Sequence, residues 1–348
     1  MAPLDLNDLE ALAREALPEM AWGYYASGAG SESTVRANRA AWAEVELAYR
    51  VLVDVSQRTM ARTVLGQSVP APIFGAPTAF HGLAHPDAEL ATARGTDSVM
   101  CLSTLSNTAV EEVVAAAAGQ VWFQLYVYRD RGAAKALVER VEAAGCSALV
   151  VTVDAPVIGQ RKADVRNRFH LPEGLTMPNV GVDLPPVNGS ALQAHFVSLL
   201  DQSLEWNDLD WLASITRLPI LLKGVVRADD ALRARDHGMA GVVVSNHGGR
   251  QLDGAVATAR ALPSIAQAVG GDLEVFVDGG IRSGHDVLRA LALGAGGVFV
   301  GRPVLHGLAW RGQQGVAWVH DTLRRELDEA MALAGCPRIE AIGPWLIA

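Results

Sequence analysis

Cysteine is scarce in this 348-residue sequence, and that scarcity limits the classes of protein it can encode. The three cysteines, Cys101, Cys146 and Cys336, show no C-x-x-C spacing. An odd number of cysteines without such spacing speaks against a disulfide framework or a zinc site. We therefore expect a cytoplasmic protein, kept in a reducing compartment, that holds no metal.

The sequence also lacks the segments that membrane and nucleic-acid-binding proteins use. No apolar run approaches the roughly 20 residues that span a bilayer. The first residues show no basic segment followed by an apolar one, which a secretory signal would require. The chain carries 29 Lys and Arg against 38 Asp and Glu, a net charge of −9, without a basic block. We expect neither a nucleic-acid partner nor a membrane partner.

What the sequence does contain is a regular alternation of short apolar runs and helical patterns. Runs that are apolar almost throughout are typical of parallel strands covered on both faces. Eight such runs are found at residues 73–76, 99–102, 121–125, 148–153, 219–222, 241–244, 274–277 and 297–300. Eight βα units predict a closed (β/α)8 barrel, a TIM barrel, in a single domain over residues 1–348. The alternative is an open doubly wound sheet, which is disfavoured because no G-x-G-x-x-G follows the first run.

Two stretches depart from this alternation. Residues 1–70 predict an N-terminal helical extension, because apolar side chains recur at helical spacing over residues 6–25. Residues 171–200 are rich in Pro and Gly and follow the fourth apolar run. An irregular segment of this length indicates a lid loop, and its place in the chain puts it at the barrel mouth.

The ends of the last two predicted strands suggest a phosphate site. Gly279, Gly280 and Gly301 would let backbone N–H groups approach a ligand closely, and Arg282 and Arg302 would supply positive charge. Loops after strands seven and eight form the phosphate site of many barrels. We expect a phosphorylated cofactor there.

The end of the sixth predicted strand suggests proton transfer. His247 can take a proton near neutral pH, and Asp154 could orient its ring. Arg161 and Arg250 can each bind a carboxylate through a planar fork. Lys223 could place a positive charge beside a reduced, anionic cofactor. This set of groups suits the removal of hydrogen from a carbon next to a carboxylate.

The motif SNHGGRQ at residues 245–251 resembles the signature of the FMN-dependent 2-hydroxy acid oxidase/dehydrogenase family. The resemblance covers nearly the whole chain, since YYASGA at 24–29, APTA at 76–79, FQLY at 123–126, TVD at 152–154, LKG at 222–224 and GRP at 301–303 agree with it. It implies FMN as cofactor and a TIM barrel as fold. It also implies the oxidation of an L-2-hydroxy acid to a 2-oxo acid, as in an (S)-2-hydroxy-acid oxidase, with O2 as acceptor and H2O2 as product.

The resemblance also assigns roles to residues. His247 would be the catalytic base with Asp154 behind it; Tyr24, Arg161 and Arg250 would hold the substrate carboxylate, and Tyr126 its hydroxyl side. The flavin ring would be held by Pro77, Thr78, Ala79, Ser103, Gln124, Thr152, Lys223 and Ser245. The phosphate end would be held by Asp278, Gly279, Gly280, Arg282, Gly301 and Arg302. A homotetramer or homo-octamer is implied by the resemblance alone.

One departure from the family bears on the substrate. Leu105 stands where glycolate oxidases place a tryptophan, so we expect a substrate side chain larger than that of glycolate. Three other functions remain open at this point: a soluble dehydrogenase with another electron acceptor, an isomerase using reduced flavin, and a non-catalytic FMN-binding protein.

Overall fold

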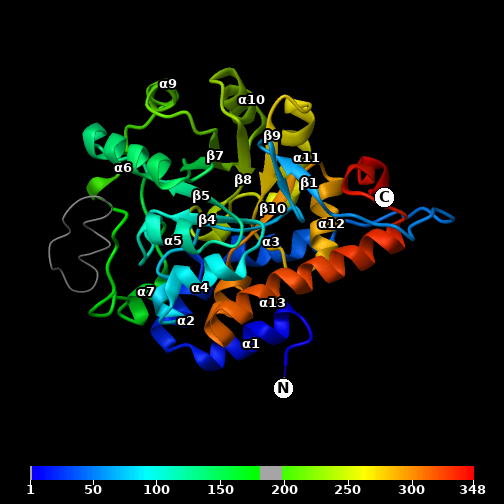
Figure 1. Ribbon diagram of the computed structural model, residues 1–348, viewed down its shortest axis with the longest axis horizontal. Coiled ribbons are helices and arrows are strands. Elements are labelled where there is room, and N and C mark those ends of the chain that lie inside the picture. The colour runs from blue at the N-terminus through cyan, green and yellow to red at the C-terminus, as the bar shows by residue number, and fades with distance from the viewer. Residues whose placement is uncertain (1, 181–197) are drawn as a thin grey trace.

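A closed barrel of eight parallel strands forms the centre of the protein (Figure 1). The computed structural model describes residues 2–180 and 198–348. Around the barrel the strands follow the order β10-β3-β4-β5-β6-β7-β8-β9. Their bounds are β3 Ile73–Gly75, β4 Val99–Ser103, β5 Gln120–Leu125, β6 Ala148–Thr152, β7 Ile220–Val225, β8 Gly241–Val244, β9 Glu274–Val277 and β10 Gly297–Val300. The predicted (β/α)8 architecture is confirmed.

Helices surround the barrel and return the chain from the end of one strand to the start of the next (Figure 1). The connecting helices are α4 Ala88–Gly95, α5 Val110–Ala116, α6 Arg131–Ala144, α9 Asn207–Ser214, α10 Ala228–Asp236, α11 Thr258–Val269 and α12 Gly284–Ala292, and α13 Arg302–Ala334 follows the last strand. A short helix, α7 Lys162–Arg166, lies in the connection after β6. The strand bounds lie within one residue of the predicted runs except at β7. Strand β7 extends to Val225 and so includes Lys223.

Alternating side chains divide each strand between two hydrophobic layers. The inner layer fills the barrel with four large rings, Phe74, Trp122, Phe276 and Phe299, each fully or almost fully buried. Their ring centroids lie 5.3 Å (Phe74–Phe299) to 5.9 Å apart, at inclined or edge-on angles. Such packing leaves no pore, so a ligand can bind only at an end of the barrel.

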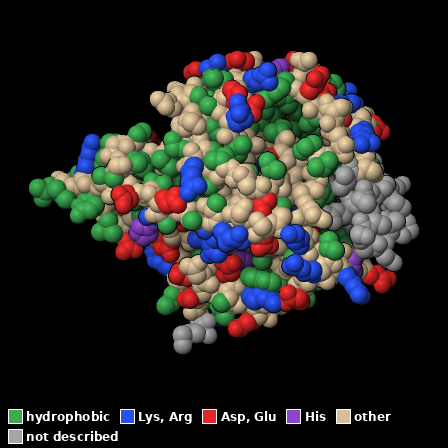
Figure 2. All heavy atoms as spheres, turned by 180° about the vertical axis from the view of Figure 1, so that it is seen from behind, with side chains coloured by type: hydrophobic (Ala, Val, Ile, Leu, Met, Phe, Trp, Pro, Cys, Tyr) green, Lys and Arg blue, Asp and Glu red, His purple; other side chains and the backbone are tan. Residues whose placement is uncertain are grey.

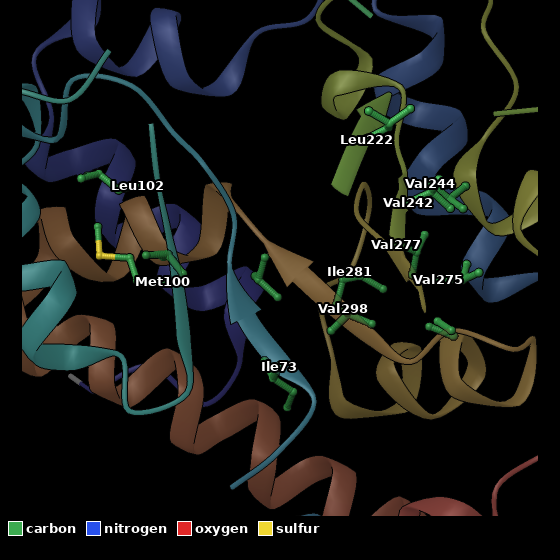
Figure 3. Packing of buried hydrophobic residues seen from close by; sticks show 14 of the residues in the cluster. Ile73, Met100, Leu102, Leu222, Val242, Val244, Val275, Val277, Ile281 and Val298 are labelled. Atoms are coloured by element: carbon green, nitrogen blue, oxygen red, sulfur yellow. The ribbon is translucent and has the colours of Figure 1, made fainter. Parts of the chain in front are cut away.

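The outer layer joins the strands to the helices. Val242, Val244, Val275, Val277 and Val298 belong to this larger cluster, and Figure 3 shows them with their neighbours. The residues between them in sequence, such as Val243 and Phe276, belong to the inner layer. Because both faces of each strand are covered, the strands are apolar almost throughout, and polar side chains such as Gln124, Thr152 and Lys223 stand near their carboxyl ends.

The N-terminal segment is less helical than predicted. The expected helix over residues 6–25 is broken at Leu17 and Pro18 into α1 Leu6–Ala16 and α2 Glu19–Ala26, because the residue before a proline disfavours helical geometry. Helix α3, Ser33–Ala43, follows. The segment then forms an antiparallel hairpin, β1 Arg62–Val64 and β2 Gln67–Val69. Val64 and Val69 pack into the inner layer, so this hairpin closes the end of the barrel where the strands begin.

The expected lid, residues 171–200, lies largely outside the described residues, since only 171–180 and 198–200 are placed. Within the described part of the chain, no helix is long and apolar enough to cross a membrane. Positive and negative side chains are mixed on the face seen in Figure 2, in accord with the absence of a basic block.

Candidate active site

A cavity opens at the carboxyl ends of the barrel strands. All but two of the predicted site residues line it: Tyr24, Pro77, Thr78, Ala79, Ser103, Gln124, Tyr126, Thr152, Arg161, Lys223, His247, Arg250, Asp278, Gly279, Gly280, Arg282, Gly301 and Arg302. The remaining two, Asp154 and Ser245, lie behind this wall and contact residues that form it. The structure therefore brings together groups that are far apart in the sequence.

His247 and Asp154 form a hydrogen-bonded pair at one side of the cavity. The Nδ1 and Oδ1 atoms are 2.9 Å apart, which leaves His247 Nε2 without a partner among the described residues. Burial opposes the ionisation of Asp154, but His247 and Lys223 outweigh it and hold the pKa of this carboxyl below its usual value. A charged Asp154 accepts a hydrogen bond from Nδ1–H and fixes the ring, so that Nε2 can accept a proton.

The backbone at His247 is held in an uncommon conformation. Its φ is +59°, in the left-handed region, and Gly248 and Gly249 follow with φ of +63° and +77°. Gly249 could not be another residue, because a Cβ there would lie 2.8 Å from the backbone nitrogen of Val35. This turn directs His247 and Arg250 toward the same cavity.

Arg161 and Arg250 form a second feature of the cavity wall. Their guanidinium carbons lie 5.5 and 5.0 Å from the centroid of the Tyr24 ring. Burial and, after it, the charge of Arg161 lower the pKa of Arg250 to about 10. Two buried cations this close repel each other, so the site favours an anion between or beside them.

Two different segments position this pair. Arg250 Nη1 donates hydrogen bonds to the Tyr24 and Ser27 carbonyls at 2.7 and 2.9 Å. Arg161 Nε donates to Asp164 Oδ2 at 2.7 Å. Each guanidinium is thus anchored to protein along one edge while its residue also lines the cavity.

Aromatic side chains surround the two arginines. Tyr24 stacks on Phe169 with ring centroids 4.2 Å apart. Burial, with Asp154 and Tyr24 after it, raises the pKa of Tyr126 well above its usual value, although Arg161 and Arg250 act against this. Tyr126 therefore stays protonated and can donate a hydrogen bond.

A chain of polar side chains crosses the floor of the cavity. Ser103 Oγ donates to Gln124 Oε1 at 3.2 Å, and Gln124 Nε2 donates to Thr152 Oγ1 at 2.9 Å. Lys223 Nζ lies 3.0 Å from Asp278 Oδ2 and 3.0 Å from Ser245 Oγ. Burial acts against the charge on Lys223, yet Asp278 and Asp154 raise its pKa overall, so a fixed ammonium stands in the floor.

The opposite end of the cavity has the features of a phosphate site. Gly279 and Gly280 have φ of +90° and +87°, and a Cβ on Gly280 would lie 2.1 Å from the Asn38 carbonyl oxygen. Helix α13 begins here, and no side chain caps its first N–H groups. Uncapped N–H groups at a helix start are well suited to bind an anion.

The two arginines at this end are arranged differently. Burial, followed by the charge of Arg39, lowers the pKa of Arg282 to about 10, and its Nε is buried without a hydrogen-bond partner among the described residues. Arg302 instead donates to the carbonyls of Tyr25, Ser27 and Gly248 at 3.1 Å. Arg302 thus ties three backbone segments together in addition to adding positive charge.

The structure adds residues that the sequence patterns did not single out. Apolar side chains make up the outer wall of the cavity beside Leu105: Ile158, Phe169, Leu171, Met177 and Leu200. They come from the irregular connections after β6, where hydrophobic periodicity gives no signal. Asn38 and Asn246 exchange two amide hydrogen bonds of 2.8 Å and join α3 to the turn that carries His247.

The donor set fits FMN. The expected phosphate end offers uncapped helix N–H groups, two left-handed glycines and an Arg282 Nε that lacks a hydrogen-bond partner among the described residues, with Glu10 3.9 Å away as its ion-pair partner. Asp278 Oδ1 is also buried without a partner, which suits a ligand hydroxyl. The polar floor offers donors and acceptors for the edge of a flat heterocycle. No cluster of three or more metal-ligating side chains occurs within the described ranges.

A barrel with the features of a phosphate site at its last two strands and a His–Asp pair at its mouth is typical of cofactor-dependent barrel enzymes. The family model described as FMN-dependent dehydrogenase matches residues 13–348. The chain is 50% identical to an L-lactate oxidase of a Nostoc strain (98% of this chain, 97% of that protein) and 48% identical to glycolate oxidase 3 of Arabidopsis thaliana (97% and 94%). A crystal structure of mandelate oxidase superposes with a TM-score of 0.92 at 43% identity, covering 98% of this chain and 97% of that one.

The chain belongs to the FMN-dependent 2-hydroxy acid oxidase/dehydrogenase family. The expected family, its FMN cofactor and its class of reaction, the oxidation of 2-hydroxy acids, are confirmed. The roles of individual residues, the particular substrate, the assembly and the location stay predictions.

Proposed function

We propose that this protein is an FMN-dependent oxidase of L-2-hydroxy acids whose side chain is larger than that of glycolate, with O2 as acceptor and H2O2 as product. The observation that carries the proposal is the shared cavity of the His247–Asp154 pair and the Arg161–Arg250 pair. The first pair can accept a proton, and the second can hold a carboxylate beside it.

The substrate carboxylate binds between Tyr24, Arg161 and Arg250. The two guanidiniums repel each other in a buried wall, and an anion removes that repulsion. The neutral Tyr126 donates a hydrogen bond to the substrate's hydroxyl side. These contacts place the carbon that bears the hydroxyl beside His247.

His247 takes up the proton that the substrate releases. Its Nε2 accepts this proton while Nδ1 remains bound to Asp154, whose negative charge stabilises the resulting imidazolium. The apolar wall excludes water, which strengthens these electrostatic interactions. When bound, FMN would supply the two-electron acceptor for this oxidation, with O2 as the final acceptor.

The cofactor is held along the whole cavity. Pro77, Thr78, Ala79, Ser103, Gln124, Thr152, Lys223 and Ser245 form the ring site, and Asp278, Gly279, Gly280, Arg282, Gly301 and Arg302 the phosphate end. Lys223 is suited to stabilise negative charge on a reduced ring, because Asp278 and Ser245 fix its ammonium in the floor. Ser245 acts from behind the wall, through Lys223 and the His247 amide.

The substrate's side chain lies against the apolar wall. Leu105 is smaller than tryptophan, and Phe169 and Met177 extend the apolar surface beside it. Aliphatic branches or a phenyl ring would bury apolar area there at about 25 cal/mol per Å². A glycolate side chain, a single hydrogen, gains nothing from that surface.

The same proposal covers assembly and location. We propose a single functional domain that acts as a homotetramer or homo-octamer in the cytoplasm. An arm between α3 and β1 projects from the barrel and exposes Tyr49, Val51 and Leu52, which supports contact with other copies of the chain (Figure 1). Cys101, Cys146 and Cys336 are free and buried, in accord with a reducing compartment.

The test is steady-state oxidation of glycolate, L-lactate, L-mandelate and D-mandelate in air, with O2 uptake and peroxide release recorded together. We expect equal amounts of O2 consumed and peroxide formed, a kcat/KM that rises from glycolate to the larger L-acids, and no turnover of D-mandelate. Turnover with an artificial acceptor but without peroxide would refute the oxidase assignment. Glycolate as the best substrate would refute the side-chain assignment.

A further inference from the structure

We propose that Gln251 is a positioning residue that fixes the His247–Asp154 pair and the Arg161–Arg250 pair relative to each other. The inference rests on the proposed function, because it concerns the same site. Gln251 lines the cavity beside Arg250, but its side-chain amide is directed to backbone groups of the loop after β6. It therefore acts on the reaction through other residues.

Three hydrogen bonds define this arrangement. The Gln251 Nε2 group donates to the carbonyls of Asp154 at 2.9 Å and Val157 at 2.8 Å. Its Oε1 accepts from the Gly159 N–H at 2.8 Å. Both amide hydrogens and the carbonyl oxygen are used, so only a glutamine-like amide in this orientation satisfies the loop.

The loop that Gln251 holds carries one member of each functional pair. Asp154 stands at its start and bonds to His247, and Arg161 stands at its end and faces Tyr24 together with Arg250. His247 and Arg250 lie on the other loop, the one that carries Gln251. The Gln251 side chain thus connects the two loops. The geometry of the His247–Asp154 pair and of the Arg161–Arg250 pair depends on the distance between these loops.

The packing around the bridge leaves little freedom. A Cβ on Gly159 would lie 2.4 Å from the Arg250 carbonyl oxygen, so the loop rests directly on the backbone beside Gln251. The Gly30 N–H donates to the Gln160 carbonyl at 3.1 Å, which ties the N-terminal segment to the same place. The side chain of Val157, in the same loop, is exposed and adds little restraint.

The test is Gln251→Met in the full-length, FMN-loaded protein. Methionine keeps the length of the side chain and removes all three hydrogen bonds. A misplacement of about 1 Å can lower a rate by about 100-fold, so we expect kcat/KM per bound flavin to fall by about 10- to 100-fold. Both kcat and KM should change, because the loop carries a member of each pair.

A binding measurement separates positioning from general stability. The 2-oxo acid product is an inert carboxylate, and its dissociation constant can be read from the perturbed flavin spectrum. We expect this dissociation constant to be larger in Gln251→Met than in the wild-type protein, while FMN content and Tm stay close to the wild-type values. Combined with Arg161→Lys, the substitution should be less damaging than the product of the two single effects, since both act on one contact.

A second variant and a control complete the design. Gly159→Ala pushes on the same loop from the other side and should reproduce the joint change in kcat and KM. Gln267→Met, on the exposed face of α11, is the matched control and should change neither. Wild-type kcat and KM per bound flavin in Gln251→Met would overturn the inference, as would a loss confined to Tm and flavin content. A wild-type protein that turns over no 2-hydroxy acid would instead refute the proposed function.

Discussion

The most informative single substitution in this site is Arg250→Lys. The arginine fulfils two tasks that a lysine cannot combine. Its Nη1 donates to the Tyr24 and Ser27 carbonyls, and the rest of the planar guanidinium remains available to the substrate carboxylate. A lysine keeps the charge but offers one nitrogen without the fork geometry.

The size of the effect can be estimated from burial and charge. Burial and then Arg161 lower the pKa of Arg250 to about 10, which marks a cation that lacks a full complement of partners. Because lysine keeps the charge, the loss is that of one hydrogen bond to a charged group, about 1.5–3 kcal/mol. At about 1.4 kcal/mol per factor of ten, kcat/KM should fall by about 10- to 150-fold.

The assay compares an acid with its neutral ester. Wild type, Arg250→Lys and the matched Arg161→Lys are each measured with an L-2-hydroxy acid and its methyl ester, at known FMN content. We expect a large loss for the acid and a small one for the ester, with Arg250→Lys the more damaging because it also frees the Tyr24–Ser27 segment. An equal loss for acid and ester, or an acid kcat/KM within threefold of wild type, would refute the assigned role.

Three further predictions follow from the same structure. His247→Asn, which tolerates the left-handed backbone, should keep FMN bound and reduce the rate of flavin reduction by at least about 100-fold in stopped flow; an unchanged rate would remove His247 as the base. Leu105→Trp should lower kcat/KM for mandelate by about tenfold or more and leave glycolate oxidation less affected; equal effects on both would exclude Leu105 from the side-chain site. Burial lowers the pKa of His306 to about 3 and of His320 to about 4, so the unfolded chain takes up more protons below pH 6.5 and stability falls as the pH falls. At pH 5 each histidine should remove about 2 kcal/mol of unfolding free energy relative to pH 8, a loss that His306→Phe should reduce by that amount in denaturant titrations; a pH dependence identical to wild type would contradict it.

The barrel was predictable because its strands are buried on both faces. Runs such as 241–244 and 297–300 are apolar throughout, and that pattern by itself indicates a parallel sheet covered by helices. The grouping of Gly279, Gly280, Arg282, Gly301 and Arg302 at one end of the cavity was predictable because these residues directly follow the last two strands. Glycines and an arginine directly after the last two strands have few other uses at the mouth of a barrel.

Local pattern was insufficient where tertiary contacts decide. Pro18 divides the first helix although the apolar spacing continues through it. The β1–β2 hairpin forms because Val64 and Val69 pack at the end of the barrel where the strands begin. Strands of only three residues are too short for a sequence pattern to predict this contact. Likewise, the hydrogen bonds of Gln251 go to backbone groups far away in the chain, and no residue pattern encodes such partners.

Anaerobic titration of the FMN-loaded protein with L-mandelate, in wild type and in His247→Asn, tests the central claim most directly. The claim is that the His247–Asp154 pair and the two arginines together allow a 2-hydroxy acid to reduce the flavin. The account predicts that one equivalent of L-mandelate bleaches the visible flavin band in the wild-type protein and leaves the His247→Asn band unchanged on the same timescale. A wild-type flavin that no L-2-hydroxy acid bleaches, or equally fast bleaching in both proteins, would contradict it.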